Sequence, residues 1–292
     1  MRDGSVSGGK LNKIKCLHNP MKFIFAAVLS FTTYFTWAQQ PSDASMCISL
    51  EKNERTLQHC NNAIAAGKYS GEMLAELHHH RGKHWAERGE VERAIQDFDA
   101  ALKLRPAVAK THHARAAELT TRGDYALALA DFDMAQKLDA KSDIAFGKGR
   151  TLFYMGNADA VATLEDALKA QPNIYIALWL YLARKGAGVP DADEQLERDT
   201  RRLRSGWPAP LVAFYMGRTD EQSILNGATD SDPVRRNELR CEADFYLAHG
   251  HLQRNQPDAK SRAQKLLRQV ETTCPKNLLE YEGAVAELRR IK

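Results

Sequence analysis

Small and aromatic side chains recur at a fixed interval along the middle of the chain. The order is a helical pattern, a glycine turn, a second helical pattern and a proline stop. The first copy, within residues 75–108, is marked by Gly82, Trp85, Gly89, Ala94, Phe98, Ala101 and Pro106. The same order returns 34 residues later, and a third copy with two single-residue deletions ends at Pro172. Small residues let antiparallel helices approach, so 75–172 predicts three helical hairpins.

These markers and their spacing resemble the tetratricopeptide repeat (TPR) family. The resemblance implies an all-α solenoid of helical hairpins, wound as a right-handed superhelix. An alternative is another helical-hairpin array, such as Sel-like repeats, whose units are longer and richer in glycine.

The regions on either side of the three repeats also have helical patterns. Residues 39–74 predict an opening helical hairpin, built around Cys47–Ala66. Residues 173–292 predict divergent, TPR-like helices that end in a capping helix at Leu278–Arg290, because a solenoid must cover its last apolar face. No stretch shows the alternation typical of a strand.

The first 38 residues are typical of a secretory signal peptide with an over-long basic region. The apolar run Phe23–Phe35 follows Lys22, and a small residue, Ala38, ends the segment. We expect the mature chain to begin at Gln39. Two alternatives remain open, a start at Met21 and an uncleaved anchor, and only the anchor would involve a membrane. No cysteine lies close behind the apolar run, so a lipid anchor is not expected.

Four cysteines follow the predicted signal segment: Cys47, Cys60, Cys241 and Cys274. Their even number suits an oxidising compartment, and they lack the close couples of a zinc site. Of three possible connectivities, we expect Cys47–Cys60 and Cys241–Cys274, since each couple flanks one predicted hairpin.

The charge balance argues against a nucleic-acid partner. The chain carries a formal net charge of +4. Residues 1–38 hold five basic residues and one acidic, so residues 39–292 balance 36 basic against 36 acidic side chains. Nucleic-acid binders usually carry a clustered basic face.

The C-terminal phrases add a second resemblance. The strings IYIALWLYLARKGAG, WPAPLVAFYMGR, CEADFYLAHGHL and TCPKNLLEYEGAVAELRRI are similar to the C-terminal part of NlpI-like TPR proteins of the bacterial envelope. This resemblance implies a periplasmic adaptor that brings together partner proteins such as cell-wall hydrolases or proteases. The chain lacks the lipid-accepting cysteine of the lipoprotein members.

The sequence contains only weak candidates for metal-binding or catalytic residues. Six histidines gather at His78, His79, His80, His84, His112 and His113. His80 and His84 share a helix face as zinc ligands do, but no Glu lies between them and no carboxylate partner is evident. We interpret these histidines as partly exposed helix surface, and the pairs Asp97/Asp99 and Asp131/Asp133 as exposed faces. We therefore expect no enzyme, no metal and no cofactor.

A protein- or peptide-binding surface is the remaining hypothesis. In TPR arrays the first helix of each repeat lines the concave groove, and the positions that carry over form what we call the first-helix surface. Its members are His79, Lys83, Glu87, Lys110, His113, Ala117, Thr121, Phe146, Arg150, Phe153 and Tyr154. The lysine–asparagine pattern of carboxylate-clamp members is missing. Two rivals remain: a structural subunit of an envelope or secretion assembly, and a metal-binding or enzymatic helical protein.

Overall fold

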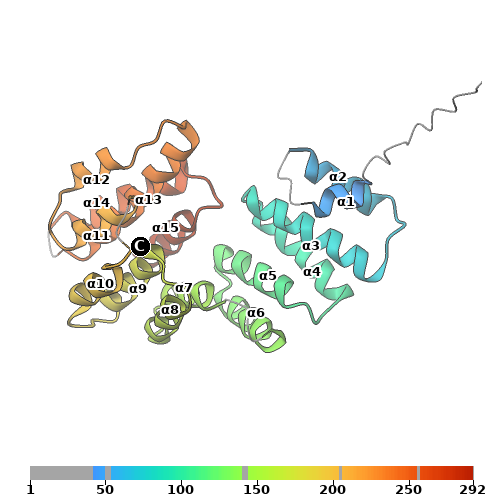
Figure 1. Ribbon diagram of the computed structural model, residues 1–292, viewed down its shortest axis with the longest axis horizontal. Helices are drawn as coiled ribbons and strands as arrows, with labels where there is room; N and C mark the ends of the chain where they lie inside the picture. The colour runs from blue at the N-terminus through green and yellow to red at the C-terminus, as the bar shows by residue number, and fades with distance from the viewer. Residues whose placement is uncertain (1–41, 50–53, 140–143, 204–205, 255–256, 292) are drawn as a thin grey trace, which may run out of the picture. The chain divides into compact units, whose positions relative to one another are not determined.

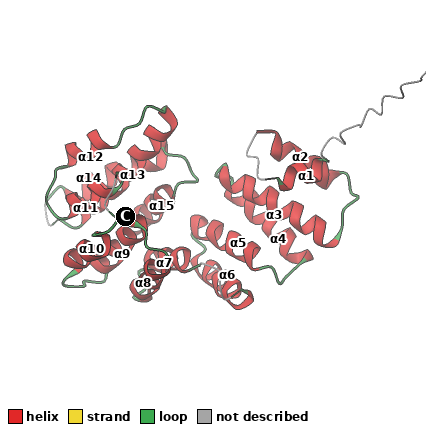
Figure 2. Cartoon of the chain, in the orientation of Figure 1, coloured by secondary structure: helices red, strands yellow, loops and turns green. Residues whose placement is uncertain are grey.

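The computed structural model describes residues 42–49, 54–139, 144–203, 206–254 and 257–291. Regular structure in these ranges is entirely helical, as Figure 2 shows, in fifteen helices labelled in Figure 1. In chain order they are α1 Asp43–Ile48, α2 Glu54–Ala65, α3 Gly71–Glu87, α4 Val91–Leu104, α5 Ala109–Arg122, α6 Tyr125–Leu138, α7 Ala145–Tyr154, α8 Asp159–Ala170, α9 Ile174–Gly186, α10 Ala192–Thr200, α11 Ala209–Tyr215, α12 Glu221–Gly227, α13 Pro233–Leu252, α14 Ala259–Thr273 and α15 Leu279–Arg290. The predicted signal segment lies outside the described residues.

Successive helices pack as hairpins, and each hairpin packs on the next. Helices α3 and α4, α5 and α6, α7 and α8, and α13 and α14 form the closest pairs, while α4 contacts α5 and α8 contacts α9. Helix α6 begins and ends 34 residues after α4. The prediction of an all-α, TPR-type hairpin solenoid is confirmed.

Glycine and alanine let the two helices of a hairpin approach closely. A Cβ on Gly82 would lie 2.7 Å from Cε1 of Phe98, so the ring of α4 occupies the space that a side chain on α3 would need. Gly149 is in the same position against Leu164 in the third hairpin. Because Phe98 is 1% exposed, this contact belongs to the core of the repeat.

The turn of the second hairpin requires a left-handed residue. Gly123 has φ 96° and ends α5, and the N–H of Asp124 donates to the carbonyl of Leu119 at 2.9 Å. A residue with a Cβ is strained at this φ, which explains glycine at the turn.

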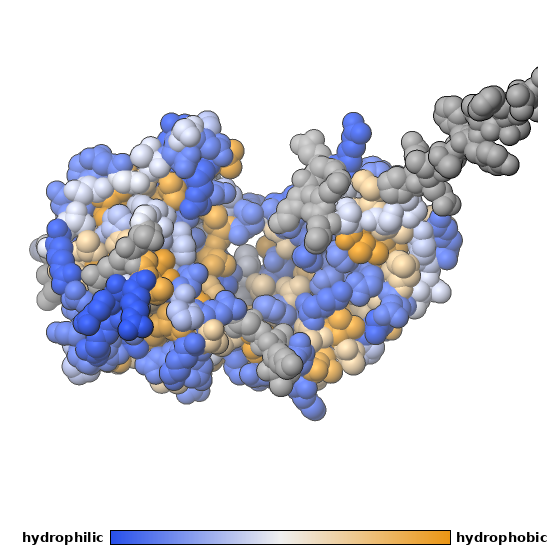
Figure 3. Space-filling model, in the orientation of Figure 1, coloured by the Kyte–Doolittle hydropathy of each residue, from blue (hydrophilic) through white to orange (hydrophobic). Residues whose placement is uncertain are grey.

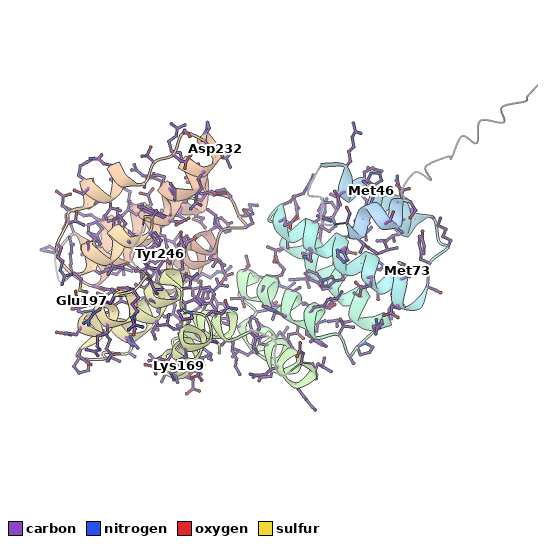
Figure 4. The ribbon with its side chains drawn as sticks, viewed as in Figure 1. Met46, Met73, Lys169, Glu197, Asp232 and Tyr246 are labelled. Carbon is purple, nitrogen blue, oxygen red and sulfur yellow. A yellow bond between two sulfur atoms is a disulfide. The ribbon has the colours of Figure 1, made fainter. Side chains whose placement is uncertain are left out.

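The C-terminal helices share a larger aromatic core. Trp179 of α9 and Tyr246 of α13 are fully buried, and Tyr246 is labelled inside this region in Figure 4. A Cβ on Gly283 of α15 would lie 2.6 Å from Cε2 of Phe245. The predicted capping helix is therefore tightly packed into this core and does more than cover an end.

Both predicted cysteine couples lie at disulfide distance. The Cα atoms of Cys47 and Cys60 are 4.7 Å apart and those of Cys241 and Cys274 are 5.9 Å apart. Cys241 lies inside α13, which already starts at Pro233. The Asp232 side chain caps that start by accepting from the N–H of Val234.

Candidate functional site

The first-helix surface divides into an accessible part and a covered part. On α3 and α5, Lys83 and Lys110 are exposed, and Glu87, His113 and Ala117 are half-buried. The remaining predicted residues make contacts within the chain. These contacts differ between α3, α5 and α7.

His79 links the first two hairpins. It is 5% exposed, and its Nδ1 lies 3.0 Å from the hydroxyl oxygen of Thr111 on α5. Burial, together with the charge of nearby Lys110, lowers the pKa of His79 to about 4. The imidazole is thus neutral at physiological pH and serves as a contact between helices.

Ion pairs also join these two hairpins. Lys110 Nζ donates to Glu76 Oε2 at 2.7 Å, and Arg105 pairs with Glu72. Burial raises the pKa of Glu76, but the hydrogen bond and charge of Lys110 outweigh it, so the net pKa is lowered. Lys83 has no ion pair with any carboxylate in the described ranges, and it remains available to a partner.

The interpretation of the histidines as partly exposed surface was wrong for His79 and His112, which are buried. The statement that His80 and His84 have no evident carboxylate partner was wrong too, since His80 Nε2 lies 3.7 Å from Glu76 and His84 Nδ1 lies 3.4 Å from Glu87. His78 Nδ1 lies 2.7 Å from Asp97, and His112 Nδ1 lies 2.7 Å from Asp131.

The interpretation of the aspartates was half wrong. Asp97 and Asp131 are buried at 4% and 5% exposure, whereas Asp99 and Asp133 are exposed as predicted. Each buried carboxylate needs charged or polar partners, which the facing helix supplies.

These partners form a cluster that repeats with the fold. In the first hairpin Arg81 donates to both oxygens of Asp97 at 2.7 Å, beside His78. In the second, Arg115 donates to Asp131 at 2.6 and 2.8 Å. Burial alone would raise the pKa of Asp97, but hydrogen bonds from His78 and Arg81 lower it below its ordinary value. We call the two sets the His–Arg–Asp clusters.

The covered part of the surface lies on α7, beneath the C-terminal helix α15. Arg150 is 5% exposed, and its Nη1 donates to Glu282 of α15 at 3.0 Å. The guanidinium also lies over the rings of Phe146 and Trp179, at 5.1 and 5.8 Å from their centroids. Arg150 therefore already has a partner within the chain.

Helix α15 also contacts α5. The hydroxyl of Thr121 lies 3.2 Å from Glu282 Oε2, and Arg289 Nη1 donates to the carbonyl of Arg122 at 3.2 Å. Tyr154 and Phe153 pack against Trp179, with ring centroids 5.8 and 5.9 Å away. Helix α7 and the C-terminal end of α5 are thus covered by later helices of the same chain, whereas Lys83 on α3 and Lys110 at the start of α5 stay exposed.

Two carboxyls near this junction have strongly raised pKa values. Burial and the neighbouring charge of Glu282 raise the pKa of Glu118 to about 7, and burial and Glu242 raise the pKa of Glu280 to about 7. Burial also raises the pKa of Tyr154 well above its ordinary value. The packing of α15 against α5 and α7 therefore places carboxyl groups close together in a buried region, where the protonated state is favoured.

Sequence reasoning missed Glu282 and Glu118. Acidic side chains on the buried face of the predicted closing helix were the available signal, since Glu280, Glu282 and Glu287 are all buried. A buried acid implies a facing partner, but the pattern could not name Arg150.

Among the described residues, no group of three or more His, Cys, Asp or Glu side chains is placed to hold a metal ion. Likewise, none of the described helices combines the length and apolar character needed to cross a membrane.

Comparisons with known proteins add little beyond this geometry. No family model and no curated protein matches the chain. A tetratricopeptide repeat protein from Parabacteroides merdae is 15% identical, with a TM-score of 0.49 over 81% of this chain and 91% of that chain. Naa15/Naa10 bound to HypK-THB is 18% identical, with a TM-score of 0.36 over 79% of this chain and 36% of that chain.

The hairpins themselves define the class. Paired helices that repeat at 34 residues in the first two hairpins, with Gly82 against Phe98 and Gly149 against Leu164, make the protein a TPR-type all-α solenoid. The finer resemblance to NlpI-like proteins stays a prediction.

Proposed function

We propose that this protein is a non-catalytic scaffold of the bacterial envelope that binds partner proteins or peptides through the accessible part of its first-helix surface. The proposal rests on the difference in side-chain exposure between the first helices of the three hairpins. Lys83 and Lys110 are exposed on α3 and α5, whereas Arg150 on α7 is buried against Glu282.

The charges of the accessible part favour an acidic partner segment. Lys83 is unpaired among the described residues, and the pair between Lys110 and Glu76 is half-exposed. Exposed ion pairs contribute little to stability, so a partner carboxylate can replace Glu76 at small cost. His113 and Ala117 provide small and aromatic contact area beside these cations.

The proposed location rests on the cysteines and on the N-terminal segment. Two couples at disulfide distance suit an oxidising compartment. The signal pattern of residues 1–38 supports export to the periplasm without a lipid anchor. Cell-wall hydrolases and proteases are the proposed class of partners.

Site-specific photo-cross-linking tests the proposal directly. A photoreactive amino acid is placed at Lys83 in cells, and the same residue is placed at Lys137 of α6 as a matched control on the second-helix face. We expect discrete cross-linked partners from position 83 and few from position 137. Equal cross-linking from both positions, or none from position 83, would contradict the proposal.

One observation favours the rival function of a structural subunit. Leu127, Met134 and Leu138 of α6 are 60%, 39% and 38% exposed and are spaced to share one helix face. Exposed apolar stripes often mark stable interfaces. Light scattering of the purified protein, with Leu127→Ser as the variant, tests this alternative: a stable assembly that the variant disrupts would favour it.

A further inference from the structure

A groove of about 780 Å³ lies where α8, α9 and α10 meet, and it contains no residue of the first-helix surface. Figure 4 labels Lys169 on its α8 side and Glu197, next to Arg198, on α10. Five basic side chains line the groove: Lys169, Arg184, Arg198, Arg201 and Arg202. We call it the arginine groove. Figure 3 shows strongly hydrophilic side chains gathered over α10.

The two acids of the groove both accept hydrogen bonds from one buried arginine. Arg184 is 5% exposed, and it donates to Asp199 at 2.6 Å and to Glu165 at 3.0 Å. Two more carboxylates, Asp191 and Asp166, pair with Arg198 and Lys169, so five basic residues against four acidic ones leave an excess of one positive charge. An incoming anion therefore meets a positive rim, although residues 39–292 as a whole carry no net charge.

The cations of the rim are available. Arg201 and Arg202 are exposed, and neither pairs with a carboxylate within the described ranges. Arg198 lies 3.4 Å from Asp191, and Lys169 lies 3.1 Å from Asp166, in pairs that are largely exposed. Such pairs contribute little and exchange readily for a ligand carboxylate.

The floor of the groove is apolar. Leu180 is fully buried beneath it, and Leu168, Pro172 and Leu203 line its sides. Free phosphate or a phospholipid headgroup would use only the cations of the rim. A flexible chain that combines carboxylates with an apolar side chain can use both parts of the groove.

We propose that the arginine groove binds an acidic peptide segment of a partner protein, with one apolar side chain on the floor and carboxylates on Arg201 and Arg202. A planar guanidinium group donates paired hydrogen bonds to the two oxygens of a carboxylate, which suits arginine at these positions. The groove would then be a second docking site, separate from the accessible part of the first-helix surface.

Fluorescence anisotropy of the purified protein tests this proposal. The probe is a labelled peptide of aspartate and glutamate residues around one central leucine. We expect binding that weakens as salt rises, and about tenfold weaker binding in Arg201→Ala/Arg202→Ala. The matched control is Lys265→Ala/Arg268→Ala, which removes two exposed cations from α14 and should leave binding within about twofold, as for charges outside the contact.

Three further arms decide between ligand classes. A peptide with serine in place of leucine should bind several-fold more weakly, because the apolar floor loses its contact. Equal binding by that peptide, full competition by inorganic phosphate, or capture only by phosphatidylglycerol vesicles would each overturn the peptide proposal. Circular dichroism confirms that the variants are folded, and loss of binding in the α14 control would equally count against the groove.

Discussion

The first two hairpins and the third share one backbone plan but satisfy their buried charges differently. In each of the first two hairpins, the His–Arg–Asp cluster lies within that hairpin. Arg81 and Asp97, for example, are only 16 residues apart. In the third, Arg150 pairs with Glu282, which lies 132 residues further along the chain.

This difference in charge pairing determines which first helices keep exposed side chains. Local clusters satisfy buried charges between the two helices of a hairpin, and the side chains of Lys83 on α3 and Lys110 on α5 remain exposed. The long-range pair uses the corresponding face of α7 to hold α15. The same repeat unit therefore keeps exposed first-helix side chains in the first two hairpins and holds another helix of its own chain in the third.

Breaking the long-range pair should have the largest effect. Arg150→Met leaves Glu282 buried without its charged partner and should reduce the free energy of unfolding by about 3–5 kcal/mol. Urea denaturation measures this loss. The double variant Arg150→Met/Glu282→Leu should recover much of it, because a well-packed apolar pair can replace a buried ion pair.

An exposed pair gives the matched control. Arg105→Ala removes the partner of Glu72, whose side chain is 73% exposed, and should cost under about 1 kcal/mol. Similar losses for Arg150→Met and Arg105→Ala would mean that α15 does not close the third repeat as the structure shows.

The two disulfides should stabilise the N-terminal and C-terminal regions by different amounts. The Cys241–Cys274 couple closes a separation of 33 residues and Cys47–Cys60 one of 13. Chain-entropy arithmetic gives a loss of about 4 kcal/mol for the first couple and about 3 kcal/mol for the second on double substitution to serine. Thermal unfolding of the two variants, compared without reductant, measures the order.

Most of the fold could be predicted from the sequence, because the 34-residue spacing depends on local contacts such as Gly82 with Phe98. The His–Arg–Asp clusters carried the same signal. His78, Arg81 and Asp97 recur as His112, Arg115 and Asp131, each 34 residues later. A search for repeated polar positions would have found them.

The covered site could not be predicted in this way. Contact between Arg150 and Glu282 depends on how the divergent helices after Pro172 return to α7, and no periodic pattern encodes that path. The positions carried over from TPR arrays lie on the first helix of each hairpin, but only the structure separates exposed Lys83 from buried Arg150.

The pH dependence of stability should distinguish the closed junction from the open hairpins. Glu118 and Glu280 have pKa values near 7 in the folded chain, against an ordinary value of 4.5. The folded state binds these protons more tightly, so their stabilising effect is full below pH 4.5 and is lost as the pH rises to about 7. Glu118→Gln should therefore lose less stability than the parent between about pH 5 and pH 8.

Two comparisons keep this test specific. His79 has a pKa of about 4, below its ordinary value of 6.5, so its effect on the pH dependence of stability is opposite to that of Glu118. Because the parent and the variants all keep His79, this effect cancels when their profiles are compared. Glu90→Gln, which removes an exposed carboxylate of the first hairpin, should follow the parent profile. Parallel profiles for all three proteins would argue against a protonated Glu118 at the junction.

The smallest expected effect concerns the accessible surface itself. Lys83→Glu reverses an exposed charge, so it should leave urea unfolding within about 0.5 kcal/mol of the parent. If partners bind α3 and α5, capture from envelope extracts should weaken by about two- to tenfold, in the range for a rim charge, and more so at low salt. Lys137→Glu makes the same charge change on α6 and should capture as the parent does. Arg150→Met/Glu282→Leu adds a second contrast, because a buried pair already closed by α15 should not contribute to capture. Loss of capture in that double variant, with full capture by Lys83→Glu, would move the binding surface from the first two hairpins to the third.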